Sequence, residues 1–300
     1  MSVGAAAGMA EPAHPLMSRG RVVVLTLLAM LAFAGNSLLC RAALKSTAID
    51  PASFTWVRLV SGALVLWSIA RLRRRGPTPQ AGDWTSAFAL FAYAAAFSFA
   101  YVSLSAATGA LLLFGAVQVT MIGFGLCKGE RLGLRQMAGL LCALLGLVWL
   151  LLPGLAAPPL QGSLLMLAAG AAWGAYSLRA RGRGDPTEVT AGNFARTLPF
   201  AVGLALIAMA HSSLDALGLV YSMASGALAS GLGYAIWYAA LPGLKTSSAA
   251  AVQLSVPVLA ALGGVLLLGE PLTQRVVLAS LVILGGIALV IARPRSSTAG

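Results

Sequence analysis

Long uncharged hydrophobic runs follow one another along nearly the whole chain, separated by short clusters of charge. The uncharged runs cover residues 22–40, 84–127, 136–178, 216–244, 246–269 and 276–292. About 20 residues of α-helix cross the hydrocarbon layer of a membrane, so the second and third runs are each long enough for two helices. Segments 103–109 and 153–159, rich in small, polar, Pro or Gly residues, predict the turns inside them. Two further spans, about 52–70 and 188–210, are each interrupted by one arginine, and the total is ten helices.

The composition agrees with a membrane protein. Hydrophobic residues make up 59% of the chain and charged residues only 9%, whereas an ordinary soluble domain carries about 25% charged residues. The net charge is +12, but the basic residues lie in clusters between apolar runs, as membrane topology requires, and not on a nucleic-acid-binding face. Disordered, disulfide-rich and nucleic-acid-binding proteins are therefore excluded. The three cysteines, Cys40, Cys127 and Cys142, are expected to be small buried hydrophobic residues.

The distribution of basic residues predicts how the chain is oriented. With the N-terminus inside, 15 of the 20 Lys and Arg residues fall in inner segments, against Arg41, Lys45 and Arg275 in outer segments. The positive-inside rule then places both termini in the cytoplasm. The first 18 residues contain no apolar segment of the kind found in signal peptides, so we expect an uncleaved tail.

The second half of the chain repeats the first at an offset of about 140 residues. Segment 123–132, GFGLCKGERL, aligns with 263–272, GGVLLLGEPL, and an aromatic-x-Arg motif ends at Arg58 and again at Arg196. Each repeat has five helices, an odd number, so the second must enter the membrane in the opposite direction. The predicted fold is an all-α polytopic membrane protein with two inverted five-helix repeats. We expect a tail at 1–20, repeats at 21–153 and 161–293, and a tail at 294–300. Such repeats are typical of alternating-access carriers with a site at the membrane midplane.

Segment 252–272, VQLSVPVLAALGGVLLLGEPL, resembles the EamA repeat of the drug/metabolite transporter superfamily, and so do Ala-Trp-Gly at 172–174 and the aromatic-x-Arg motifs. The likeness covers about 20–293. Segment 109–121, GALLLFGAVQVTM, has no proline at the position of Pro257 and is more similar to the YddG-type bacterial amino-acid exporters. This resemblance implies a place in the bacterial inner membrane and export of aromatic and other neutral amino acids. The alternatives are export of other small metabolites or drugs in the same fold, and a pore or membrane-embedded binding partner.

Aromatic residues inside the spans are the first candidates for a binding cavity. Tyr93 and Phe97 lie four residues apart and share one helix face, and Tyr234 and Trp237 are their counterparts in the second repeat. Two aromatic walls would suit a planar or ammonium-bearing solute through stacking and cation–π contact. The other interpretation is aromatic packing or an interfacial belt. The candidates of this kind are Tyr93, Phe97, Trp173, Tyr176, Tyr234 and Trp237.

Amide side chains in the apolar spans form the second set of candidates, namely Asn36, Gln118 and Gln253. An amide there either hydrogen-bonds a substrate or ties helices together. Gln253 is the strongest candidate because Pro257, four residues later, cannot donate to its carbonyl and must disturb the helix. Broken helices at the midplane are where transporters bind their substrates, so Pro257 is the candidate for a helix break or gate.

Arg196 is the candidate partner for a substrate carboxylate. It lies about ten residues into its span, roughly 15 Å deep, and a cation at that depth needs a partner. The alternative partners are the acidic residues at the start of the span or backbone carbonyls. Arg58 is shallower, and a motif that recurs in both repeats favours a scaffold role. Glu130 and Glu270, each before a new helix, are expected to stabilise helix N-termini.

The remaining expectations are absences and partners. All eight acidic residues fall in loops, termini or span edges, whereas an exporter of organic cations is expected to hold a buried carboxylate in its path. The sequence contains no phosphate loop, no catalytic triad and no His or Cys cluster for a metal, so we expect neither an enzyme nor a cofactor. The expected partners are a small-molecule substrate and the lipid bilayer, with no nucleic acid. Small-residue faces such as that of Ala229 and Gly233 pack helices either within one chain or between two copies in a homodimer.

Overall fold

The structure is a computed structural model, and it describes residues 18–73, 81–129, 131–154, 157–179, 185–244 and 246–291. The helices of the first repeat are α1 (Arg19–Ser46), α2 (Pro51–Arg73), α3 (Trp84–Tyr101), α4 (Ala106–Cys127) and α5 (Leu134–Leu151). Those of the second are α6 (Leu160–Arg179), α7 (Pro186–Ala208), α8 (Ala216–Ala224), α9 (Gly233–Ala240), α10 (Thr246–Gln253), α11 (Ser255–Leu268) and α12 (Gln274–Ile291). Short 3₁₀ turns, η1 (Met209–His211) and η3 (Leu241–Gly243), follow α7 and α9, and a π-helical segment, η2 (Ser225–Leu232), joins α8 to α9.

The helices begin at residues whose side chains satisfy the free amides of the first turn. Asp83 caps α3, Ser105 caps α4, Asp185 caps α7 and Asp215 caps α8, each accepting a hydrogen bond from a backbone N–H two or three residues later. Such caps place the carboxylates of Asp83, Asp185 and Asp215 at helix ends, outside the apolar middle of the helices.

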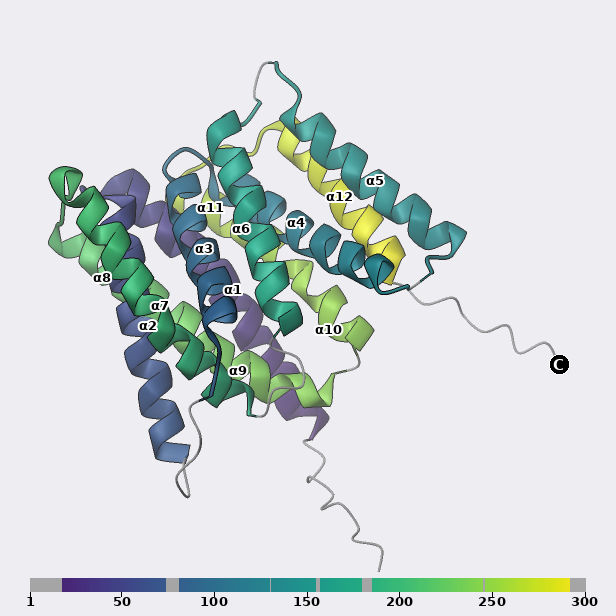
Figure 1. The fold of residues 1–300 in the computed structure, drawn as a ribbon. Coiled ribbons are helices and arrows are strands. Elements are labelled where there is room, and N and C mark those ends of the chain that lie inside the picture. Colours follow the sequence, from purple (N-terminus) through teal and green to yellow (C-terminus); the bar gives the residue numbers. More distant parts are fainter. Residues whose placement is uncertain are drawn as a thin grey trace, which may run out of the picture.

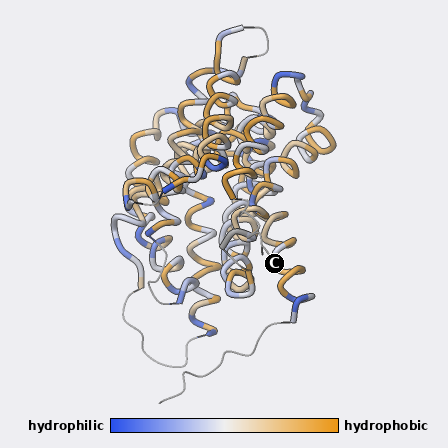
Figure 2. Tube along the Cα trace, turned by 90° about the vertical axis from the view of Figure 1, so that its right-hand side faces the viewer, coloured by the Kyte–Doolittle hydropathy of each residue, from blue (hydrophilic) through white to orange (hydrophobic). Residues whose placement is uncertain are grey.

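The prediction of an all-α polytopic protein is confirmed. Within the described residues no strand occurs, and nine helical rods are long and apolar enough to cross a membrane. Three of these rods are composite: α7 continues into η1, α8 continues through η2 and α9 into η3, and α10 continues into α11. The tenth predicted span, α6, is not one of these nine rods, and it packs against α3 and α4. Figure 2 shows that hydrophobic residues predominate along the helices.

The two repeats are interleaved around an approximate two-fold relation. The fifth helices, α5 and α12, pack side by side at one edge of the bundle, and the second helices, α2 and α7, also pack together (Figure 1). The first helix of each repeat packs against the third and fourth helices of the other: α6 on α3 and α4, and α1 on the α8–α9 rod and α11. This exchange places α1 and α6 at the centre, between the halves.

Close packing of α2 on the π-helical segment depends on glycine. A Cβ atom at Gly226 would overlap the backbone carbonyl of Arg58 and the hydroxyl of Ser61, and one at Gly62 would lie 2.7 Å from a ring carbon of Phe194. Gly233 likewise approaches Ala32 of α1, where a Cβ would lie 2.9 Å from the alanine methyl. The small-residue face that includes Gly233 is therefore used within one chain.

We expect Gly226→Ala to destabilise the protein by about 1–3 kcal/mol, because the added methyl meets backbone atoms of α2 that cannot move aside. The measurement is the midpoint of thermal unfolding in detergent, which should fall by several degrees. Gly285→Ala in α12 is the matched control, since no atom lies within 4 Å of the position of its Cβ. Equal midpoints for the two variants would contradict this account of the α2–η2 contact.

Candidate functional site

A cavity of about 490 Å³ lies between the two repeats, with walls from α1, α3, α4, α6, α9 and α10. The structure brings eight of the residues singled out in the sequence to its surface: Asn36, Tyr93, Phe97, Gln118, Trp173, Tyr234, Trp237 and Gln253. They come from both repeats, which is the arrangement that a shared site between inverted halves requires.

Aromatic rings form a continuous surface along the cavity. The ring centroids of Tyr93 and Trp173 are 4.9 Å apart, and those of Trp173 and Tyr234 are 5.0 Å apart. Phe33, which sequence reasoning missed, lies edge-on to Tyr234 and Trp237 at 5.8 and 6.0 Å. The rings expected to form two separate walls are thus joined through Trp173 of α6.

A chain of hydrogen bonds joins two residues of this lining, Asn36 and Tyr93, to Ser225 and Arg58 behind it. Ser225 donates to Oδ1 of Asn36 over 2.7 Å, and Nδ2 of Asn36 donates to the hydroxyl oxygen of Tyr93 over 3.2 Å. Nη2 of Arg58 donates to the same hydroxyl oxygen over 3.0 Å. Ser225 belongs to the π-helical segment η2, and π-helical turns are frequent at functional sites because they redirect side chains.

Arg58 is the functional candidate that sequence reasoning assigned to the scaffold. Its side chain is buried, and its guanidinium carbon lies 5.2 Å from the ring centre of Tyr93 and 4.9 Å from that of Phe97. Both rings line the cavity, so the cation stands one ring layer behind its wall.

Arg196, which we expected to meet a substrate carboxylate, is not brought to the cavity. Its Nη1 donates to the backbone oxygens of Ala81 over 2.7 Å and Gly192 over 2.9 Å. Backbone carbonyls were one of the two alternative kinds of partner, and these two hydrogen bonds have that arrangement. The reason is that side chains on a helix lean toward its N-terminus, so the guanidinium reaches back to the segment before α3.

Two further candidates lie near the cavity but do not line it. Tyr176 is fully buried and stacks behind Trp173, with ring centroids 5.4 Å apart. Pro257 lies in α11, three residues beyond a break in the helix: α10 ends at Gln253, and α11 begins at Ser255. The break presents the Gln253 side chain to the cavity.

The cavity extends from the middle of the bundle toward the face at which α1 begins, which we call the N-terminal face. Its lining reaches Ser177 at the end of α6, Pro186 at the start of α7 and Leu244 after η3. In the other direction Phe97 packs edge-on against Tyr101, with centroids 4.8 Å apart.

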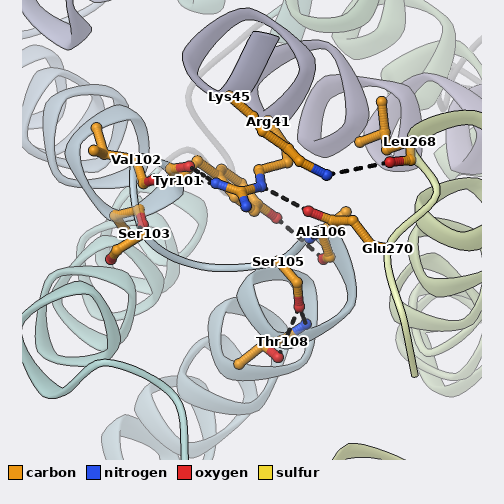
Figure 3. A network of polar contacts seen from close by, with 11 residues as sticks. Arg41, Lys45, Tyr101, Val102, Ser103, Ser105, Ala106, Thr108, Leu268 and Glu270 are labelled. Atoms are coloured by element: carbon orange, nitrogen blue, oxygen red, sulfur yellow. Dashed lines mark hydrogen bonds and ion pairs between the residues drawn. The ribbon is translucent and has the colours of Figure 1, made fainter. Parts of the chain in front are cut away.

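Beyond Tyr101 a polar network ties the opposite face together (Figure 3). Nε of Arg41 pairs with Oε1 of Glu270 at 2.7 Å, and Nη1 of Arg41 donates to the backbone oxygens of Tyr101 and Val102 at 2.9 and 3.1 Å. Oε2 of Glu270 accepts from the backbone N–H of Ala106 at 2.7 Å. The opposite end of the cavity is therefore closed by contacts between α1, the α3–α4 turn and the α11–α12 connection.

This network corrects the expectation for Glu270. The carboxylate does lie at a helix N-terminus, but it is that of α4 in the other repeat and not that of the helix that follows it. Sequence neighbourhood could not reveal a contact between residues 164 positions apart. Glu130, its counterpart in the first repeat, lies outside the described residues.

An ion pair also joins two helices at the N-terminal face. Nη2 of Arg179, at the end of α6, lies 3.0 Å from Oδ1 of Asp83, which caps α3. Partial burial by itself would raise the pKa of Asp83, but hydrogen bonds from Ser86 and Arg179 outweigh it and lower this pKa to about 2. The carboxylate is thus ionised at neutral pH and holds α3 to α6.

The cavity wall itself contains no Asp, Glu, Lys or Arg among the described residues. Nor do the described residues hold a group of three or more His, Cys, Asp or Glu side chains suited to a metal ion. What the arrangement offers a ligand is aromatic surface, three amides and the field of a buried cation.

Comparison with known proteins agrees with this architecture. The model of the EamA-like transporter family matches the chain twice, at residues 20–152 and 160–292. The uncharacterized protein PA1977 of Pseudomonas aeruginosa strain PAO1 is 64% identical over 272 residues, which cover 91% of this chain and 95% of that protein. A protein of known crystal structure superposes with a TM-score of 0.63 at 22% identity, covering 91% of this chain and 98% of its own; this likeness concerns the fold alone.

Both family matches coincide with the two halves that surround the cavity, and together they cover nearly the whole chain. A multi-pass helical protein built from two such halves is a membrane transporter of small molecules. The chain belongs to the EamA-like transporter family.

Proposed function

We propose that this protein is a secondary transporter that exports amino acids, aromatic and other neutral ones, across the bacterial inner membrane by alternating access. The observation that carries the proposal is the cavity between the repeats, which has aromatic walls, extends to one face and is closed at the other. The resemblance of segment 109–121 to YddG-type exporters supports the amino-acid substrate.

The chemistry of the wall matches a neutral amino acid. The rings of Tyr93, Trp173 and Tyr234 offer an apolar surface on which a hydrophobic or aromatic side chain gains contact and stacking energy. The amides of Gln118 and Gln253 can donate to a carboxylate and accept from an ammonium group. The cavity volume falls within the range of about 300–1,000 Å³ usual for small-ligand sites.

The asymmetry between the two ends supports alternating access over a pore. A pore would need a continuous path, whereas the Arg41–Glu270 network and the Phe97–Tyr101 contact close one end. If the basic N-terminal face is cytoplasmic, as the charge distribution favours, the cavity faces the cytoplasm and receives the substrate that is to be exported. Release on the other side would then require Arg41 and Glu270 to separate.

We expect Gln253→Ala to lower amino-acid transport at least tenfold without lowering the amount of protein in the membrane, because it removes an amide at the helix break in the wall. The measurement is uptake of radiolabelled phenylalanine, leucine and other neutral amino acids into proteoliposomes. Gln274→Ala, at the exposed start of α12, is the matched control and should transport normally. Normal uptake by Gln253→Ala would remove this residue from the site. A flat response of the wild-type protein to the whole panel would favour other metabolites or drugs as substrates.

Removing the charge of Glu270 should open the closed face. We expect Glu270→Gln to increase at least fivefold the rate at which a charged methanethiosulfonate modifies Cys40, which is fully buried one residue before Arg41. The assay uses a background in which Cys127 and Cys142 are replaced by Ser, with modification followed by mass spectrometry. Asp215→Asn, which removes another carboxylate at the same face without touching Arg41, should leave the rate unchanged. An unchanged rate in Glu270→Gln would show that the ion pair does not keep this end closed.

A further inference from the structure

A positive charge lies behind the wall of the cavity, and none of the residues that the structure describes supplies a counterion for it. Arg58 is 1% exposed. Its Nη2 donates to Tyr93 over 3.0 Å and its Nε reaches Ser230 at 3.4 Å, whereas its Nη1 is buried with no hydrogen-bond partner. Leaving a donor of a charged group buried without an acceptor costs free energy. A ligand that brings negative charge near this guanidinium would lower that cost.

The carboxylates of the described residues are committed elsewhere. They are Asp50, Asp83, Asp185, Glu188, Asp215 and Glu270, and every one lies at or within a turn of a helix end. Glu270 pairs with Arg41, and Asp83 pairs with Arg179. In this part of the chain none of them forms an ion pair with Arg58, whose guanidinium instead meets two neutral hydroxyls and the ring faces of Tyr93 and Phe97.

Ring faces attract a cation but do not cancel its field. In a low-dielectric interior that field acts strongly over one ring layer, and it favours an anion and disfavours a cation on the cavity side. Tyr93 carries the effect to the wall as well. Its oxygen already accepts hydrogen bonds from Arg58 and Asn36, which makes its own proton a stronger donor at a residue that lines the cavity.

We infer that Arg58 sets the charge selectivity of this cavity: ligands that carry a carboxylate are accepted, and ligands whose only charge is an ammonium group are rejected. Arg58 does this from behind the wall, through its field and through Tyr93, and is therefore a selectivity residue that does not touch the ligand. The inference deepens the proposed function, on which it rests for the size and shape of the ligand.

The experiment measures binding of three probes that share a phenyl ring and differ in charge: L-phenylalanine, 3-phenylpropionate and phenethylamine. Purified full-length protein in detergent is titrated while the fluorescence of its tryptophans is followed, since Trp173 and Trp237 line the cavity. We expect the wild-type protein to bind both carboxylates at least tenfold more tightly than phenethylamine. Arg58→Gln should reduce that ratio at least tenfold, and Arg58→Lys, which keeps the charge, should retain most of it.

The chain supplies a matched control in the second repeat. Arg196→Gln removes the equivalent arginine, whose Nη1 is held by backbone carbonyls away from the cavity, and should leave the ratio unchanged. If Arg58→Gln cannot be purified as a folded protein, Tyr93→Phe tests the same route, and it should lower carboxylate affinity more than phenethylamine affinity.

The outcomes separate this inference from the proposed function. Tight binding of 3-phenylpropionate and phenylalanine, with no amino-acid transport in proteoliposomes, would refute the exporter and leave the role of Arg58 standing. A wild-type protein that binds phenethylamine as well as the carboxylates, or that binds none of the three, would overturn the role of Arg58. The same holds if the ratio is unchanged in Arg58→Gln.

Discussion

A polar group inside a membrane has no water to bind, and most of this structure follows from that constraint. The backbone N–H and C=O groups are satisfied by hydrogen bonds within the helices of the described spans. Four buried polar side chains, those of Ser225, Asn36, Tyr93 and Arg58, satisfy the same constraint by forming one hydrogen-bonded chain inside the bundle. Because these groups must find each other, the helices that carry them, α1, α2, α3 and the α8–α9 rod, are held in one arrangement around the cavity.

The two faces of the bundle satisfy their charges in different ways. At the face opposite the N-terminal face, Arg41 pairs with Glu270 and donates to a carbonyl of the α3–α4 turn. These contacts join the two repeats. Arg179, 138 positions later and at the corresponding place in α6, pairs instead with Asp83 at the start of α3. The corresponding arginines of the two repeats thus bind different partners, and the two ends of the bundle are held together by different contacts.

The hydrophobic pattern was enough to predict the helices and the turns between them, because the thickness of a bilayer fixes the length of a spanning helix. The helix break after Gln253 could also be predicted, since Pro257 has no N–H to donate. Residues such as Tyr93, Trp173 and Gln118 could be selected for the cavity because polar and aromatic groups inside an apolar span pack against or hydrogen-bond a partner.

The sequence could not show which of the repeated arginines, Arg58 or Arg196, lies next to the cavity. Depth along the span favoured Arg196, but the direction in which a side chain leans and the carbonyls within its reach decided that Arg58 stands behind the cavity. The π-helical turn that aims Ser225 at Asn36, the position of Tyr176 behind Trp173 and the contact of Glu270 with α4 likewise depend on neighbours distant in the chain. Hydrophobic patterning is sufficient to identify the segments that enter the membrane and the residue types that need partners there. The identity of each partner depends on how the helices pack, because periodicity and composition describe one helix at a time, whereas the partners of these residues lie on other helices.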